Sequence, residues 1–150
     1  QKTAYEMLRS LVGSEMCIRD SKEAGTVKVL NIYKSQNGIA ISELSEVEFI
    51  STIYRKFRDK EVNEETLNVL LEKFQFDVEN KYEVLMFSSA IIDEACSLLS
   101  KYGGTKSLRS LDSIQLAFFE VYCESEDIFV CSDKKLAEIV ELEKYKVLVS

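Results

Sequence analysis

The sequence predicts an α/β domain with a mainly parallel central sheet, and three observations support this. Short apolar segments rich in β-branched residues alternate with longer segments whose apolar residues recur every three to four positions. That alternation is typical of parallel strands connected by helices. The 150 residues include no proline and five glycines, and no linker or repeat divides them. The length is sufficient for one hydrophobic core, so we expect a single domain.

In the first half, residues 26–36 form an amphipathic pattern that predicts a helix, and the Asn-Gly pair at 37–38 predicts a turn. Residues 39–42 (IAIS) predict a short strand, and residues 43–60 predict the helix that follows it. An apolar row is expected along one side of that helix: Leu44, Val47, Ile50 or Ser51, and Tyr54.

The second half continues the same alternation. Asn63, followed by acidic residues, is a favourable helix start, and a glycine pair at 103–104 is a favourable stop. The segment SLRSLDSIQLAFF, from Ser107, predicts a helix that extends to about Cys123. Strands are predicted at 82–87, 127–132 and 145–150, and helices at 63–78, 88–104, 107–123 and 133–144.

The composition excludes several kinds of chemistry. Histidine is absent, and none of the four cysteines forms a C-x-x-C pair, so a zinc site or a histidine-activated nucleophile is not expected. Hydrolysis would therefore depend on carboxylates holding a hard cation. The net charge of −7 argues against general nucleic-acid affinity, although metal-binding acids would contribute to it. No apolar run is long enough to span a membrane, and no secretory signal is recognisable, which favours a cytoplasmic location.

Three acids stand out by their position. Asp112 shares a predicted helix face with apolar residues, where an unpaired charge would be costly. Asp133 follows the predicted strand at 127–132, and Glu48 lies in the second turn after the strand at 39–42. Ligands of parallel sheets bind beyond the carboxyl ends of the strands, so these acids are candidate metal ligands. Asp133 has a second interpretation as a helix cap, and Glu48 as a surface acid.

Three segments together resemble the PIN domain, in particular the VapC-type toxins of prokaryotic toxin–antitoxin pairs. Ser42, Leu44 and Glu48 match a Ser-x-Leu-x-x-x-Glu segment. Residues 108–117 match a Leu-Arg-x-Leu-Asp helix, and residues 129–136 match a Phe-Val-x-x-Asp-x-x-Leu junction. The match covers about residues 22–150.

The resemblance implies a PIN-like three-layer sandwich and a Mg²⁺- or Mn²⁺-dependent endoribonuclease. Carried over by position, its catalytic and metal-binding acids are Glu48, Asp112 and Asp133, with Ser42 and Ser132 in supporting roles. Arg109 and Lys134 would contact RNA. The implied partners are an RNA substrate, a small antitoxin protein and a second copy of the chain.

The first acid of the family pattern is missing. The opening strand should end in Asp-Ser or Asp-Thr about thirteen residues before Gly25, but no acid lies there. The segment SLVGSEMCIRDS resembles translated sequencing-adapter DNA, which suggests that residues 1–21 are not native and that the domain, 22–150, lacks its first strand. Alternatively, residues 16–21 replace that strand and Asp20 supplies the acid. The missing acid leaves a catalytically impaired binding module as the other functional interpretation.

Overall fold

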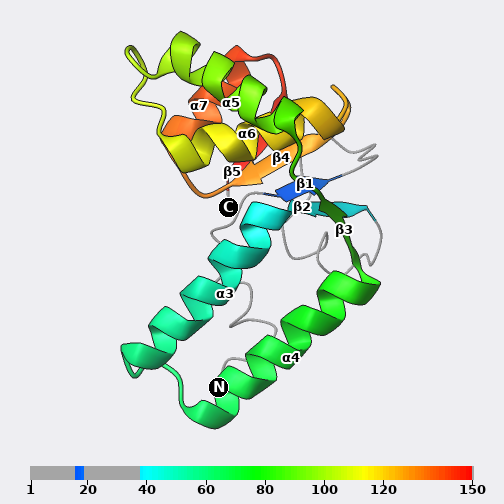
Figure 1. Cartoon of the computed structure of the whole chain (residues 1–150), viewed down its shortest axis with the longest axis vertical. Helices are drawn as coiled ribbons and strands as arrows, with labels where there is room; N and C mark the ends of the chain where they lie inside the picture. The colour runs from blue at the N-terminus through cyan, green and yellow to red at the C-terminus, as the bar shows by residue number, and fades with distance from the viewer. Residues whose placement is uncertain (1–15, 19–37, 150) are drawn as a thin grey trace.

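The structure, a computed structural model, describes residues 16–18 and 38–149. Their strands form one five-stranded sheet in the order β3-β2-β1-β4-β5 (Figure 1). The strands are β1 (Met16–Ile18), β2 (Ile39–Ser42), β3 (Tyr82–Leu85), β4 (Ile128–Cys131) and β5 (Lys146–Val149). The helices are α3 (Glu43–Arg58), α4 (Glu64–Asn80), α5 (Ser89–Tyr102), α6 (Ser110–Tyr122) and α7 (Lys134–Leu142).

The sheet is mixed rather than mainly parallel. β2 pairs with β3 and β4 pairs with β5 in parallel, as the alternation of strands and helices predicts. The central strand β1 runs antiparallel to both of its neighbours. Because Ile18 lies opposite Ile39 and Ile128, the first residues of β2 and β4, the chain leaves β1 at the end of the sheet remote from Ser42.

Helices cover both faces of the sheet. On one face, α3 and α4 pack over Ile39 and Ile41 of β2 and over alternate residues of β4. On the other face, α5, α6 and α7 pack over Ala40 of β2 and Phe129 of β4. These residues alternate along the strands with those of the first face, so their side chains point to the opposite side of the sheet. In Figure 1, α3 and α4 lie side by side and extend away from the sheet as a hairpin.

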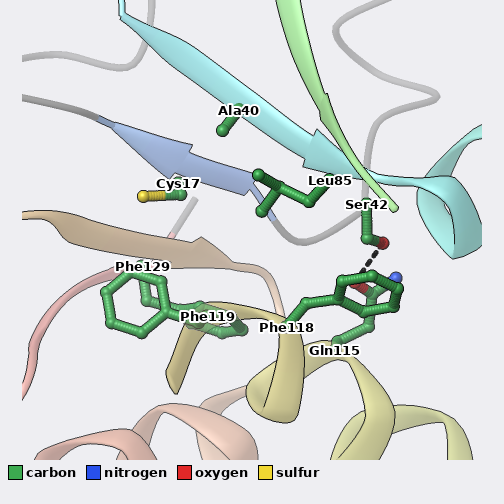
Figure 2. A pocket seen from close by; sticks show the side chains of 8 residues that line it. All are labelled: Cys17, Ala40, Ser42, Leu85, Gln115, Phe118, Phe119 and Phe129. Atoms are coloured by element: carbon green, nitrogen blue, oxygen red, sulfur yellow. Dashed lines mark hydrogen bonds between the residues drawn. The ribbon is translucent and has the colours of Figure 1, made fainter. Parts of the chain in front are cut away.

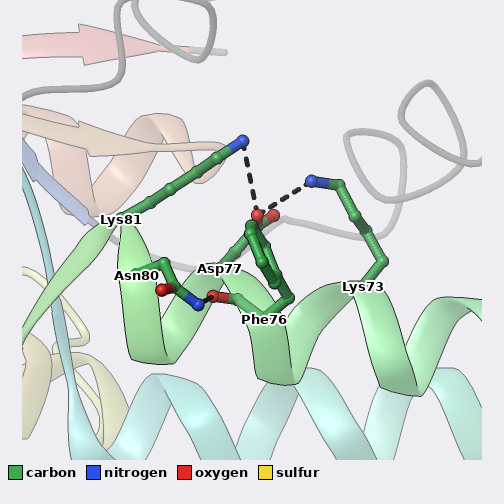
Figure 3. Close-up of polar contacts among 5 residues, drawn as sticks. All are labelled: Lys73, Phe76, Asp77, Asn80 and Lys81. Atoms are coloured by element: carbon green, nitrogen blue, oxygen red, sulfur yellow. Dashed lines mark hydrogen bonds and ion pairs between the residues drawn. The ribbon is translucent and has the colours of Figure 1, made fainter.

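Within α4, a buried carboxylate is held between two lysines. Asp77 Oδ1 lies 2.9 Å from Lys73 Nζ and 3.4 Å from Lys81 Nζ, one helical turn to either side (Figure 3). Asn80 donates a side-chain hydrogen bond of 2.8 Å to the carbonyl oxygen of Phe76. An acid near a helix C-terminus is unfavourable to the helix dipole, and the two lysines offset that effect.

Two predicted elements differ from the structure in informative ways. The helix predicted from Ser107 begins at Ser110, because Ser107 has a φ of 57° and cannot continue a right-handed helix. The apolar row predicted along 43–60 is not the buried side of α3, which is formed by Ser45, Phe49 and Ile53. The helix predicted at 26–36 lies outside the described residues.

No helix in the described part of the chain is both long and apolar enough to cross a membrane.

Candidate functional site

The three predicted acids project from three different helices beside one end of the sheet. Glu48 lies in the second turn of α3, which begins directly after β2. Asp112 lies in the first turn of α6, and Asp133 caps α7, two residues after β4 ends. Because β2 and β4 run in the same direction, their carboxyl ends bring Glu48 and Asp133 to the same edge of the sheet.

Asp133 is a helix cap, as one of its two interpretations predicts. Its Oδ1 accepts hydrogen bonds from the backbone N–H groups of Lys135 (2.8 Å) and Leu136 (3.3 Å). Both bonds use the same oxygen, and no hydrogen bond among the described residues is made to Oδ2. The carboxylate can therefore cap α7 and still present an oxygen to a ligand.

Asp112 interacts electrostatically with each of the other two acids. Burial, followed by the charge of Asp133, raises the pKa of Asp112, while the Arg109 guanidinium opposes this. Burial, followed by the charge of Asp112, raises the pKa of Glu48, while a side-chain hydrogen bond from Gln115 opposes it. Asp112 is thus the central acid, close enough to both others for repulsion, as expected of carboxylates without a cation.

The three acids do not form a compact cage. Among the described residues, the group of three whose ligand atoms all lie within 4.8 Å of one another is a different one: Cys17, Cys123 and Asp127. Asp127 there also accepts a 2.8 Å hydrogen bond from the backbone N–H of Glu124. An ion shared by Glu48, Asp112 and Asp133 would therefore require their side chains to draw together around it.

A pocket of about 490 Å³ opens in front of two of these acids. Asp112 and Asp133 line it together with three basic side chains, from Lys106, Arg109 and Lys135. Of the two predicted RNA-contacting residues, Arg109 lines this pocket and Lys134 is not among the lining residues. Lys106 and Lys135 were not predicted as site residues, although Lys106 belongs with Arg109 to one group of basic residues in the sequence.

Ser42, for which the resemblance predicted a supporting role, ends β2, and its side chain contacts Gln115. The Ser42 hydroxyl caps α3 by accepting the backbone N–H of Ser45 (3.0 Å), and it donates to Gln115 Oε1 (2.8 Å). Gln115 Nε2 in turn donates to Ser45 Oγ (3.0 Å). Figure 2 shows the Ser42–Gln115 bond at the rim of a small cavity of about 10 Å³ that phenylalanines line.

Gln115 therefore belongs to the site, because it fixes α6 against α3 and also contacts Glu48. Its place on the same helix face as Asp112 was visible in the sequence, but nothing there distinguished it from a surface amide. Ser132, the other predicted supporting residue, is exposed beside Asp133. Asp20 lies outside the described residues.

A second pair of carboxyl groups lies between α5 and α6. Burial, a side-chain hydrogen bond with Glu94 and the charge of Glu94 raise the pKa of Glu120 to about 8. The charge of Glu143 acts in the same direction, while Lys101, which is paired with Glu143 at 3.0 Å, opposes it. This pair is separate from the acids that line the pocket.

No family model, curated protein or solved structure matches this chain. The resemblance to the PIN domain therefore depends on the three sequence segments and on the position of their acids.

Proposed function

We propose that this chain is a PIN-like, metal-dependent endoribonuclease that hydrolyses RNA phosphodiesters. The observation that carries the proposal is the pocket in which Asp112 and Asp133 lie beside Lys106, Arg109 and Lys135. A polyanionic backbone needs cationic groups to bind it, and phosphodiester hydrolysis without histidine needs carboxylates that hold a metal ion. One pocket supplies both kinds of group.

The donor set fits Mg²⁺ or Mn²⁺. Glu48, Asp112 and Asp133 offer only carboxylate oxygens, the ligands that hard divalent cations prefer. Burial, followed by the charge of a neighbouring acid, raises the pKa of Glu48 and of Asp112, and a cation would relieve the repulsion between the acids. When bound, such an ion supplies an activated water and stabilises the leaving oxygen.

The residues of this chain then have distinct roles. Asp112 and Asp133 hold the ion from the pocket wall, with Glu48 completing the set from α3. Gln115 and Ser42 keep α3 and α6 at a fixed separation, and Ser132 supports Asp133. Arg109, Lys106 and Lys135 bind the phosphates on either side of the scissile bond, and Lys134 extends this basic surface along α7.

The resemblance to VapC-type toxins extends the proposal to the cellular setting. In that setting the domain is a cytoplasmic toxin with a three-layer PIN-like architecture, it works as a homodimer, and a small antitoxin protein neutralises it. The test of this part is co-expression with the protein encoded by an adjacent small gene, which should remove ribonuclease activity and co-purify with the chain.

The central experiment measures metal binding and RNA cleavage on the same variants. Mn²⁺ should raise the melting temperature of the wild-type chain, and a fluorescent single-stranded RNA should be cut with Mn²⁺ and remain intact with EDTA. Asp112→Asn should abolish both effects. Asp93→Asn, an exposed acid on α5, is the matched control and should preserve both. Absence of any metal-linked stabilisation in the wild type would contradict the proposal.

A binding module that does not cut RNA is the second candidate, and the direction of β1 favours it. The family pattern places its first acid at the end of the opening strand, whereas β1 ends at the edge of the sheet remote from Ser42. In this case Lys106→Ala with Arg109→Ala would weaken RNA binding, while the wild-type chain would leave RNA uncut at any metal concentration.

A further inference from the structure

Two cysteines and an aspartate meet where the end of α6 lies against the sheet. The Sγ atoms of Cys17 and Cys123 and a carboxylate oxygen of Asp127 all lie within 4.8 Å of one another. Cys17 comes from β1, Cys123 ends α6, and Asp127 directly precedes β4. Cys17 and Asp127 are buried, at 3% exposed each. No C-x-x-C pair marks this cluster in the sequence, because its members come together only in the folded chain.

Backbone hydrogen bonds fix the elements that carry these ligand atoms. Cys17 is the middle residue of β1 and lies opposite Ala40 of β2 and Phe129 of β4. The turn that leads into β4 is closed by two hydrogen bonds between Glu124 and Asp127. The Asp127 N–H donates to the Glu124 carbonyl oxygen (3.0 Å), and Asp127 Oδ2 accepts from the Glu124 N–H (2.8 Å). The strand and the turn therefore hold their ligands on backbone that the fold itself keeps in place.

The spacing and the ligand types fit Zn²⁺. Tetrahedral Zn²⁺ has Zn–S distances of about 2.3 Å and Zn–O distances of about 2.0–2.2 Å, so its two sulfurs lie about 3.8 Å apart and a sulfur and an oxygen about 3.5 Å apart. Separations within 4.8 Å reach these values with movements of little more than about 1 Å. Thiolate sulfur selects Zn²⁺ over the hard cations Mg²⁺ and Mn²⁺, which prefer oxygen. The cluster thus differs in its chemistry from the acids at the pocket.

We propose that Cys17, Cys123 and Asp127 bind Zn²⁺ and that the ion joins β1 to the turn before β4. On binding, each thiol releases its proton to solvent as its sulfur bonds to the ion, and Asp127 contributes one carboxylate oxygen. Water supplies the fourth ligand from the side of Cys123, which is only partly buried. The site is independent of the proposed ribonuclease, since none of its residues lines the pocket of Asp112 and Asp133.

The ion strengthens the attachment of a very short strand. β1 has three residues, and it pairs with β2 and β4 through them. A bond from Cys17 to the ion anchors the strand through a side chain as well as through the backbone, whatever the origin of residues 1–21. A disulfide between the two cysteines would also anchor β1, but it needs an oxidant to remove two electrons and makes no use of Asp127. Zinc needs no oxidant and uses all three side chains.

Titration of the full chain with Co²⁺, in the presence of a reductant that contains no thiol, tests the site. The wild-type chain should develop a sulfur-to-cobalt charge-transfer band that saturates at one ion per chain and disappears when Zn²⁺ is added. Cys17→Ser and Cys123→Ser should each weaken this binding at least about a hundredfold, since loss of an outer partner alone costs about 10–100-fold. Cys96→Ser, which replaces an exposed cysteine on α5, is the matched control and should keep the band. Circular dichroism establishes which variants fold, and Cys123→Ser decides the result if Cys17→Ser does not.

Two further measurements separate this site from the acids of the pocket and test its role. Asp112→Asn should lose the effect of Mn²⁺ on the melting temperature and keep the sulfur-to-cobalt band, so either proposal can fail alone. Zn²⁺ should slow amide hydrogen exchange in β1 of the wild-type chain and leave it unchanged in Cys123→Ser. A wild-type chain without the band, a band that survives Cys123→Ser, or a band that Cys96→Ser abolishes would each overturn the proposal. Exchange in β1 of the wild-type chain that Zn²⁺ does not slow would overturn it as well.

Discussion

The hydroxyl of Ser42 and the amide oxygen of Gln115 are joined by a 2.8 Å hydrogen bond although 73 positions separate them in the chain. Both side chains are buried, at 3% and 4% exposed. The bond connects the residue that ends β2 and caps α3 to the middle of α6. Two of the three candidate acids, Glu48 and Asp112, lie on those two helices, so this bond connects the elements that carry them.

Gln115→Leu should therefore destabilise the fold and separate the acids. Removing the amide leaves the buried hydroxyls of Ser42 and Ser45 with fewer hydrogen-bond partners. The free energy of unfolding should fall by about 1–3 kcal/mol. Urea denaturation measures that loss. A double-mutant cycle with Ser42→Ala should show coupling, because the two side chains share one interaction. Independent, additive losses would mean that the hydrogen bond contributes little.

The carboxyl pair between α5 and α6 should make stability depend on pH. Burial and the hydrogen bond with Glu94 raise the pKa of Glu120 to about 8 in the folded chain, well above its ordinary value of 4.5. The folded state therefore holds a proton that the unfolded state releases. The resulting stabilisation is complete below pH 4.5 and is lost as the pH rises towards 8.

Glu120→Gln removes this dependence while keeping a side chain that can donate to Glu94. We expect the variant to gain stability relative to the wild type as the pH rises from 5 to 8.5, measured by denaturation at several pH values. Glu138→Gln, an exposed acid on α7, should show no such gain. A constant difference between Glu120→Gln and the wild type across the pH range would contradict the assignment.

Two substitutions of Asp133 separate its capping role from its proposed metal role. Asparagine is as good an N-cap as aspartate, so Asp133→Asn should keep the stability of the metal-free chain within about 0.5 kcal/mol. Asp133→Ala removes the bonds to the Lys135 and Leu136 N–H groups and should cost about 1 kcal/mol. Both variants should lose the rise in melting temperature with Mn²⁺; if Asp133→Asn retains it, Asp133 is only a cap.

Asp77→Asn should weaken α4 by about 1 kcal/mol, since the amide cannot replace the ion pairs with Lys73 and Lys81. Because Asp77 is 6% exposed, the effect should persist at high salt, where surface ion pairs are screened. Thermal unfolding at low and high salt measures the loss of stability and its dependence on salt. Glu79→Gln, an exposed acid on the same helix, serves as the control and should lose less than about 0.5 kcal/mol.

Much of the fold followed from periodicity. The strand at 39–42, the start of α4 after Asn63 and the alternation of strands with helices are all confirmed. Local patterns predict these because alternation and capping are local properties. The exposed side of α3 could not be predicted in this way, because its two apolar rows are equivalent until the sheet determines which one is buried. The PIN-like identity and the metal remain predictions.

The site shows the same limit. Glu48 and Asp133 were identified from their place after strands and Asp112 from its place on an apolar helix face, and the structure brings the three within electrostatic reach of one another. Gln115, Lys106 and Lys135 were not predicted as site residues, because their roles depend on contacts between elements that are distant in the sequence. The direction of β1 could not be predicted for a related reason, because three residues carry too little pattern to fix an orientation. The strands that pair with β1 decide its direction.

The short strand β1 has a consequence for solubility. It lies at the centre of the sheet order, and within the described part of the chain its three residues join the β3-β2 pair to the β4-β5 pair. If it detaches, the backbone N–H and C=O groups along the inner sides of β2 and β4 lose their partners. Unpaired edges of this kind recruit strands from other molecules. Shortening the chain past Ile18 would thus divide one continuous sheet into two pairs of strands, each with a new edge for intermolecular β-pairing, and precipitation would precede any loss of helix content.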